Sequence, residues 1–297
     1  MRFFESAERF VLIALFLIAA VFMQGCASKV QSLPEISPLA LLEEDSDIYL
    51  GIPVKYHKDL VVSLISSQTG LSQGNASTVA GRIDVLYAGL GNSGEPSRIQ
   101  VSATGSFPSF AVGIALSESS GWRKKNYSAE SSEAALGAGY PNEFKYYYNS
   151  LVPYKISFPT EKELLLAKRI SPLLENYALR RDCASLPYND FISLDKNESR
   201  DILFYAADPS SIIAALFTEM AAGWFEKARG KLSKLSSGDY SLQATLYLKD
   251  KNRKTVVKAI MSLAGIPVQE IDETTLKVSN IKVTKKQIET IASGKLR

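Results

Sequence analysis

Strict alternation of apolar and polar residues predicts an antiparallel β-hairpin in the last third of this chain. Every second residue between Tyr240 and Lys249 is apolar, and the segment 224–235 alternates in a similar way. A period of two residues is typical of a strand with one buried face, and Ser-Ser-Gly-Asp at 236–239 is a turn sequence. The buried face is predicted to carry Leu242, Ala244, Leu246 and Leu248, with Glu226, Ala228, Gly230 and Leu232 opposite them.

The other face of this hairpin is predicted to be basic with one aromatic ring. It carries Lys227, Arg229, Lys231, Gln243, Thr245, Tyr247 and Lys249. Helices are expected to cover the apolar face, because apolar surface is stabilised by removal from water. The basic face is then either open or packed against the rest of the body.

The order of predicted elements repeats along the chain. Segments 47–181 and 201–297 each begin with a strand, followed by a helix, two strands, a second helix and further strands. This is the order of the split βαβ, or ferredoxin-like, unit. We therefore predict an α+β fold of two tandem ferredoxin-like βαββαβ units, with antiparallel sheets and helices on one face of each. One mixed α+β domain without internal symmetry is the alternative.

The helices are predicted from apolar residues at helical spacing and from capping residues. Their predicted ranges are 58–66, 109–117, a segment beginning at Glu161, 210–220, 254–263 and 285–293.

The N-terminal segment is predicted to be an export signal. Residues 10–23 form an uninterrupted apolar run, which is shorter than the roughly 20 residues that span a bilayer and fits the core of a signal peptide. The run ends in Met23-Gln24-Gly25-Cys26, which resembles a bacterial lipobox. The resemblance implies that residues 1–25 are removed and that Cys26 carries acyl chains such as palmitate. An uncleaved N-terminal anchor helix and a signal cleaved elsewhere are the alternatives.

Lipidation at Cys26 implies a location at the cell envelope. Two or more acyl chains anchor a protein stably, whereas a single chain binds reversibly. No Asp follows the cysteine, and by analogy with enterobacterial sorting this favours the outer membrane over the inner one. The body is then expected in the periplasm or at the cell surface.

The predicted division of the chain follows from these segments. It consists of a signal peptide (1–25), a lipidated cysteine and tether (26–46), a first domain (47–181), a connector (182–200) and a second domain (201–297). Within the tether, residues 39–42 are apolar and could pack against the body.

Composition and motifs argue against several activities. The net charge of +3 is too small to favour nucleic acid as a partner. Cys183 is the only other cysteine, so no internal disulfide is expected if Cys26 is lipidated. The G-x-G-x-x-G at 89–94 leads into another strand rather than a helix, so it is interpreted as a hairpin loop.

No catalytic set or metal site is predicted. Ser193 and Lys196 match S-x-x-K, but its companion motifs are missing. His57 is the only histidine and is expected to begin a helix. With a single histidine and one free cysteine, a zinc site in this chain would need mostly carboxylate ligands, which is unusual for zinc. No cofactor is expected.

An aromatic segment is a candidate binding surface. Tyr146, Tyr147 and Tyr148 lie in the aromatic-rich range 139–158, and tyrosines can offer flat platforms to sugars or peptides. Alternation places Tyr146 and Tyr148 on one face and Tyr147 on the other, so part of the segment is expected in the core. Residues 128–139 are interpreted as an insertion found only in the first half, where function tends to concentrate.

These observations predict a membrane-anchored lipoprotein with a non-catalytic binding or envelope-assembly role. Its expected partners are the lipid bilayer, through Cys26, and an envelope protein. Lys227, Arg229 and Lys231 could meet anionic lipid headgroups or an acidic partner, and a solvated sheet face is the alternative. A solute-binding lipoprotein with its ligand between the halves, near 182–200, and an enzyme with an unrecognised site are the rival functions.

Overall fold

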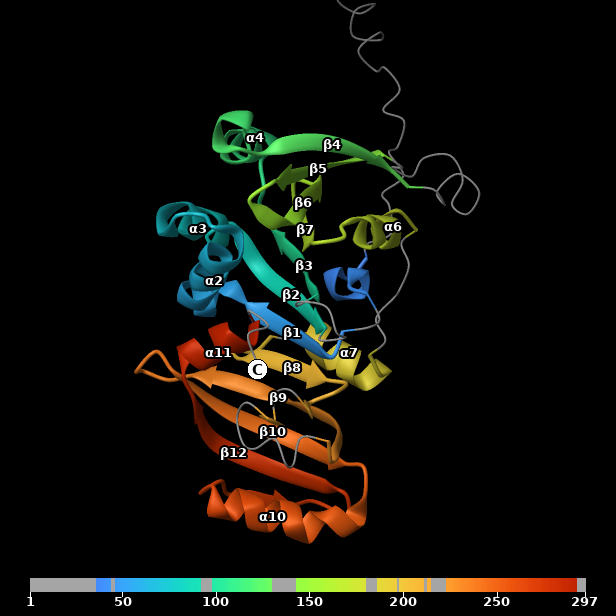
Figure 1. The fold of residues 1–297 in the computed structure, drawn as a ribbon, viewed down its shortest axis with the longest axis vertical. Helices are drawn as coiled ribbons and strands as arrows, with labels where there is room; N and C mark the ends of the chain where they lie inside the picture. The colour runs from blue at the N-terminus through green and yellow to red at the C-terminus, as the bar shows by residue number, and fades with distance from the viewer. Residues whose placement is uncertain are drawn as a thin grey trace, which may run out of the picture. The chain divides into compact units, whose positions relative to one another are not determined.

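An antiparallel β-sheet of 12 strands runs through the described part of the chain (Figure 1). The structure is a computed structural model that describes residues 36–43, 46–91, 98–129, 143–179, 186–196, 198–210, 213–214 and 223–292. In spatial order the strands are β11 (Val268–Glu270), β12 (Thr275–Val283), β10 (Tyr240–Leu248), β9 (Phe225–Lys234), β8 (Ile202–Ala206), β1 (Ile48–Pro53), β2 (Ile83–Gly91), β3 (Arg98–Gly105), β7 (Glu163–Ala167), β6 (Val152–Thr160), β5 (Glu143–Asn149) and β4 (Arg123–Ser128).

The predicted α+β class with antiparallel sheet and helices is confirmed, but the strand order is not that of two ferredoxin-like units. In a ferredoxin-like unit another strand separates the two strands that flank the first helix. Here β1 pairs directly with β2, and β8 pairs directly with β9. Because β1 also pairs with β8, the segments 47–181 and 201–297 share one sheet. Alternation fixes which face a side chain takes, whereas the choice of neighbour depends on contacts distant in sequence.

Helices lie on both faces of the sheet rather than on one (Figure 1). One face packs against α2 (Val54–Thr69), α3 (Gln73–Ala80), α10 (Lys254–Leu263) and α11 (Lys285–Ala292), which all contribute buried residues to the largest core cluster. The opposite face is partly covered by three short elements. These are η1 (Pro38–Leu41), α6 (Ser171–Leu179) and α7 (Tyr188–Asp195).

The short helix η1 belongs to the body although its sequence was predicted to be part of the tether. Leu39, Leu41 and Leu42 have no exposed surface, so the expectation that residues 39–42 pack on the body is confirmed. The Ser37 hydroxyl accepts a hydrogen bond from the amide of Leu39, which caps the helix.

The helix predicted from Glu161 is wrong. That region forms β7, between β3 and β6, and the next helix is α6, which begins at Ser171. Leu164 and Leu165 are both buried, each in a different core cluster. Since β7 is covered on both faces, its sequence lacks the alternation that marks a half-exposed strand.

Other predicted elements differ mainly in extent. The helix at Lys254–Leu263 has the predicted bounds, and Gly265 follows it with φ 71°, as expected for a glycine after a helix end. The two extended segments expected at 275–278 and 281–283 form one strand, β12, with Asn280 at φ 59° where the register shifts. The connector 182–200 contains α7.

The remaining described elements are α4 (Ser109–Ala115), η2 (Glu118–Ser120) and η3 (Lys251–Arg253). Among the described residues, none of the helices is both long and apolar enough to cross a bilayer. The predicted signal peptide, Cys26, Cys183, most of the insertion at 128–139 and most of the helix predicted at 210–220 lie outside the described residues.

Candidate functional site

The basic face predicted for the β9–β10 hairpin is present, and no element in the described part of the chain lies over it. Thr245 pairs with Arg229 and Gln243 pairs with Lys231, so these four residues share the face that the alternation predicted for them. Leu242, Ala244, Leu246 and Leu248 of β10 are buried, while the residues between them are half-exposed. One detail of the prediction is wrong: Glu226 is exposed, and Phe225 fills the buried position opposite Leu248 because the register shifts there.

Four neighbouring strands align one residue each across this face. Tyr205 of β8 lies opposite Arg229 of β9, Arg229 opposite Thr245 of β10, and Thr245 opposite Lys277 of β12. Adjacent strands are about 4.8 Å apart, so the backbones of Arg229 and Lys277 are roughly 10 Å apart with the threonine between them. Two long cationic side chains thus flank a hydroxyl group.

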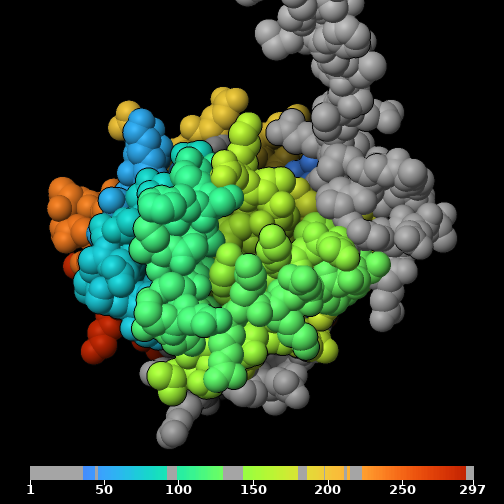
Figure 2. Space-filling view, turned by 90° about the horizontal axis from the view of Figure 1, so that it is seen from above, coloured from blue at the N-terminus to red at the C-terminus, as the bar shows by residue number. Residues whose placement is uncertain are grey.

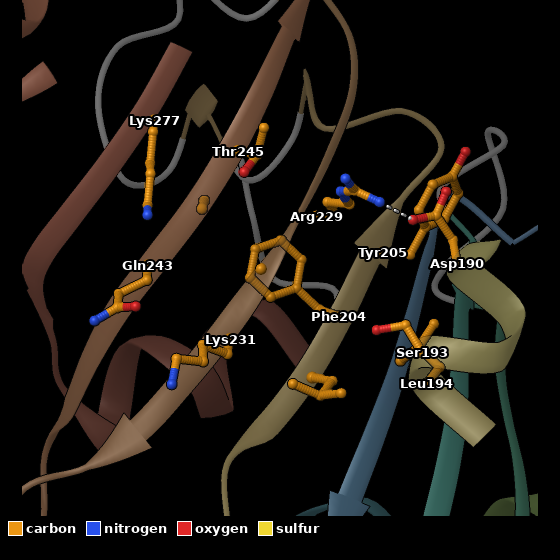
Figure 3. Close-up of a pocket in the computed structure, with 13 residues that line it drawn as sticks. Asp190, Ser193, Leu194, Phe204, Tyr205, Arg229, Lys231, Gln243, Thr245 and Lys277 are labelled. Carbon is orange, nitrogen blue, oxygen red and sulfur yellow. Dashed lines mark hydrogen bonds and ion pairs between the residues drawn. The ribbon is translucent and has the colours of Figure 1, made fainter. Parts of the chain in front are cut away.

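A groove of about 260 Å³ lies over this row. Its walls come from α7, β8, β9, β10 and β12 (Figure 3). The polar and charged residues that line it are Asp190, Ser193, Tyr205, Arg229, Lys231, Gln243, Thr245 and Lys277. In Figure 3 the lysine and glutamine side chains stand on the sheet, and Arg229 extends across to α7.

Two of the three cations in the groove are already paired. Arg229 Nη1 lies 2.9 Å from Asp190 Oδ1, and Lys231 Nζ lies 2.8 Å from Asp201 Oδ2. The hydrogen bond to Asp190 raises the pKa of the Arg229 guanidinium above its ordinary value. Lys277 is exposed and forms no ion pair with any described carboxylate. An incoming anion would therefore meet one unpaired ammonium group and two cations held in position by carboxylates.

The aromatic ring on the basic face holds two cations above it. Lys227 Nζ lies 5.0 Å from the ring centroid of Tyr247, and Arg229 Cζ lies 5.8 Å from it. Cation–π contact of this kind is attractive. It orients Lys227 and Arg229 along β9, so the predicted residues Lys227, Arg229 and Lys231 form a continuous basic row.

The three tyrosines of the aromatic segment are on β5, at the other end of the sheet. Tyr146 is buried in the core cluster under α6, and Lys155 Nζ lies 5.6 Å from its ring centroid. Tyr148 packs against the same cluster, and Tyr147 packs against the cluster on the opposite face. The predicted alternation is thus present, and the structure does not bring the tyrosines together with the basic row.

His57 lies in the interior and does not line the groove. It is fully buried at a kink in α2, where its Nε2 lies 2.8 Å from the carbonyl of Arg200 and its Nδ1 lies 3.3 Å from the hydroxyl of Tyr240. Burial lowers the pKa of its imidazole. Ser193 lines the groove, but no hydrogen bond joins it to Lys196 among the described residues. Nor do the described histidines, cysteines and carboxylates form a metal-binding group of three.

Two charged residues of the groove were missed from the sequence. Lys277 lies on a predicted strand, and its alternation with Leu276 and Val278 was a usable signal. Asp190 lies in the segment predicted as a connector, and its approach to Arg229 had no sequence signal because 39 residues separate the two.

A family model matches residues 34–289, and its description is "Outer membrane-associated lipoprotein TP0453". The chain belongs to this family. Membership confirms the predicted lipoprotein character and the predicted envelope location, with the outer membrane favoured. It also places the body, which the sequence patterns did not assign to any family, within the TP0453 family.

Solved structures of TP0453 share the fold. Crystal form I has a TM-score of 0.68 at 16% identity, covering 88% of this chain and 98% of that one. Crystal form III has a TM-score of 0.65 at 16% identity, covering 87% and 98%. At this identity the likeness concerns the fold alone. No curated protein matches the sequence of this chain.

Proposed function

We propose that this member of the TP0453 family is a non-catalytic binding protein, anchored to the outer membrane through lipid on Cys26, that binds an extended polyanion in the basic groove. The observation that carries the proposal is the row of Arg229, Thr245 and Lys277 across three strands, on a sheet face that no described element covers. An anionic group above Thr245 can accept a hydrogen bond from its hydroxyl and lie within reach of both cations.

An extended chain fits this groove better than an enclosed solute does. Small-molecule pockets usually have about 300–1,000 Å³ and bury most of their ligand, whereas this groove has about 260 Å³ and is open. Side chains on one face of a strand repeat about every 6.7 Å, so Lys227, Arg229 and Lys231 can meet successive charges of a linear chain.

The position of the groove supports this occupant over a flat bilayer surface. One wall is α7, which rises beside the sheet (Figure 3). A flat layer of headgroups cannot enter a groove with such a wall, while a single extended chain can. The rival function of a solute-binding lipoprotein predicted a pocket near 182–200. The groove does include Asp190, Ser193 and Leu194 from that range, but its size disfavours an enclosed ligand.

The test compares charge reversal inside and outside the groove. Binding of fluorescent poly-L-glutamate and of polyphosphate to the full-length protein in detergent is measured for the wild type, Lys277→Glu and Lys286→Glu. Lys286 is an exposed lysine of α11, on the other face of the sheet, so the two variants have the same net charge.

Lys277→Glu is expected to weaken binding by about tenfold, because it removes one positive charge and adds one negative charge, each contributing up to about 1 kcal/mol. Lys286→Glu is expected to bind nearly as tightly as the wild type. Equal weakening by the two variants would show that net charge alone drives binding, and the groove would then not be the site. Neutral dextran should bind none of the three proteins.

A further inference from the structure

The end of the sheet formed by β4 has an edge that no other described strand covers. Within the described residues β4 pairs only with β5, from Arg123 opposite Tyr148 to Ser128 opposite Glu143, without a register shift. An edge strand presents backbone N–H and C=O groups that can pair with another chain. Figure 2 looks onto this end of the molecule, and the green region of β4 and α4 lies on the surface there.

The opposite edge of the sheet is protected in a way that β4 is not. β11 has three residues, and its Glu270 is bound to Lys254 and Lys258 of α10. A very short edge strand offers little to pair with. β4 has six residues and contains neither proline nor a bulge.

Charge is the property that decides which chain the β4 edge accepts. Arg123, Lys124 and Lys125 are consecutive, exposed, and without an ion-pair partner among the described carboxylates. Consecutive strand residues point to opposite faces, so both faces are basic along this edge. Lys145 of β5, opposite Asn126 and also exposed, adds a fourth cation.

The same charges disfavour a second copy of this chain. If residues 123–126 paired antiparallel with themselves, Lys124 of each copy would face Lys125 of the other. Like charges directly opposite each other destabilise a strand pair, and opposite charges stabilise it. The charges on β4 therefore disfavour pairing between two copies of this strand and favour pairing with an acidic strand.

We propose that β4 binds an acidic, extended segment of another envelope protein as an additional antiparallel strand. Backbone hydrogen bonds along Arg123–Asn126 would hold the segment, as in other complexes formed by strand addition. Carboxylates on consecutive residues of the segment would lie opposite Arg123, Lys124 and Lys125. Tyr148 and Tyr146, opposite Arg123 and Lys125 on β5, would then form the next row of the extended sheet.

The experiment uses the full-length protein in detergent and a pair of synthetic peptides. The first peptide is Val-Thr-Glu-Glu-Glu-Thr-Val, and the second has the same sequence with N-methyl groups on alternate residues. N-methylation leaves the charge unchanged, removes the N–H donors of the methylated residues and places methyl groups along the edge that would pair with β4. Dissociation constants are measured by fluorescence anisotropy, and hydrogen exchange of residues 123–126 is followed by mass spectrometry.

The unmodified peptide is expected to bind and to slow exchange at 123–126, while the N-methylated peptide binds at least about tenfold more weakly. The double variant Lys124→Glu/Lys125→Glu is expected to weaken binding of the first peptide by a similar factor. Lys286→Glu, which alters an exposed lysine of α11, is expected to leave the slower exchange at 123–126 unchanged. Because that exchange reports on β4 and not on the groove, failure here is distinguishable from failure of the proposed groove.

Three results would overturn the proposal. Equal binding of the two peptides would mean that charge alone attracts them. Binding without slower exchange at 123–126 would place the peptide elsewhere. If neither peptide binds, but vesicles containing an anionic lipid bind to the wild type and not to the double variant, the β4 edge contacts a membrane surface instead of a strand.

Discussion

Leu41→Ala is expected to destabilise the body as strongly as a substitution in the centre of a core, although residue 41 lies in a segment whose sequence is typical of a tether. Leu41 has no exposed surface and packs in the cluster that includes Leu173 and Leu174 of α6. Its carbonyl accepts a hydrogen bond from Asn176 Nδ2 at 3.1 Å. The short helix η1 thus fills space between α6 and the sheet.

The magnitude follows from burial. Truncating a fully buried leucine to alanine costs about 2–5 kcal/mol, because the transfer free energy is lost and a cavity remains. In a body of this size, 1 kcal/mol shifts the thermal midpoint by roughly 2–4 °C. A loss of about 3 kcal/mol therefore lowers the midpoint by roughly 6–12 °C.

The assay is urea denaturation of the full-length protein in a non-ionic detergent, followed by tryptophan fluorescence. Leu151→Ala is the control because Leu151, in the turn between β5 and β6, is 90% exposed. The control is expected to change the free energy of unfolding by less than about 0.5 kcal/mol. If the two variants unfold at the same urea concentration, η1 does not pack on the body and the reasoning fails.

The outcome also bears on how far the body can stand from the membrane. If the packed part of the chain begins near Ile36, nine residues lie between it and Cys26. Such a segment reaches at most roughly 35 Å when fully extended. A body that began at residue 47, as the sequence suggested, would have about twice that reach.

Three further predictions concern glycine, histidine and the anchor. Gly230→Ala should lower the free energy of unfolding, measured by urea denaturation, by about 1–3 kcal/mol, because an added Cβ would lie 2.1 Å from the carbonyl oxygen of Gln243 and 2.9 Å from the ring of Phe204. Gly113→Ala, on an open side of α4, should instead raise it by about 0.5–1 kcal/mol. If Gly113→Ala were the less stable of the two variants, the described packing at Gly230 would be refuted. Burial holds the pKa of His57 below its value in the unfolded chain. As pH falls below about 6.5, the unfolded chain therefore binds more protons at this histidine than the folded one does. The free energy of unfolding should then decline from pH 7 to pH 5, by at most about 1.4 kcal/mol per pH unit from this group. His57→Gln should flatten that decline, and an unchanged slope would assign it to other groups. Labelling with radioactive palmitate should mark the wild type but not Cys26→Ala, and unchanged labelling in the variant would rule out lipidation there.

The β9–β10 hairpin shows what could be predicted from local sequence. Its turn, its register and its two faces follow from alternation, because adjacent strands joined by a four-residue turn have few ways to pair. The basic face was therefore predicted almost completely. On the buried face the exception was Glu226, which the register shift exchanged with Phe225.

Elements that depend on distant contacts were not predictable in this way. β7 lacks alternation because different core clusters cover its two faces. The helix α7 lies in the segment that was predicted to be a connector. The pairing of β1 with both β2 and β8 made one sheet out of two predicted ones. Each of these arrangements depends on side chains that are far apart in the sequence and adjacent only in the folded chain.

The sequence by itself predicted an export signal and determined the class of fold and the basic face, because each of these is specified by runs or periods of neighbouring residues. The tertiary structure decided that no described element lies over this face, that α7 forms a wall beside it, and that Lys277 joins Arg229 across Thr245. It also decided which strand became the edge. A strand's own residues set its two faces, but its neighbours are chosen by the packing of the whole sheet, and the free edge is whatever that packing leaves over.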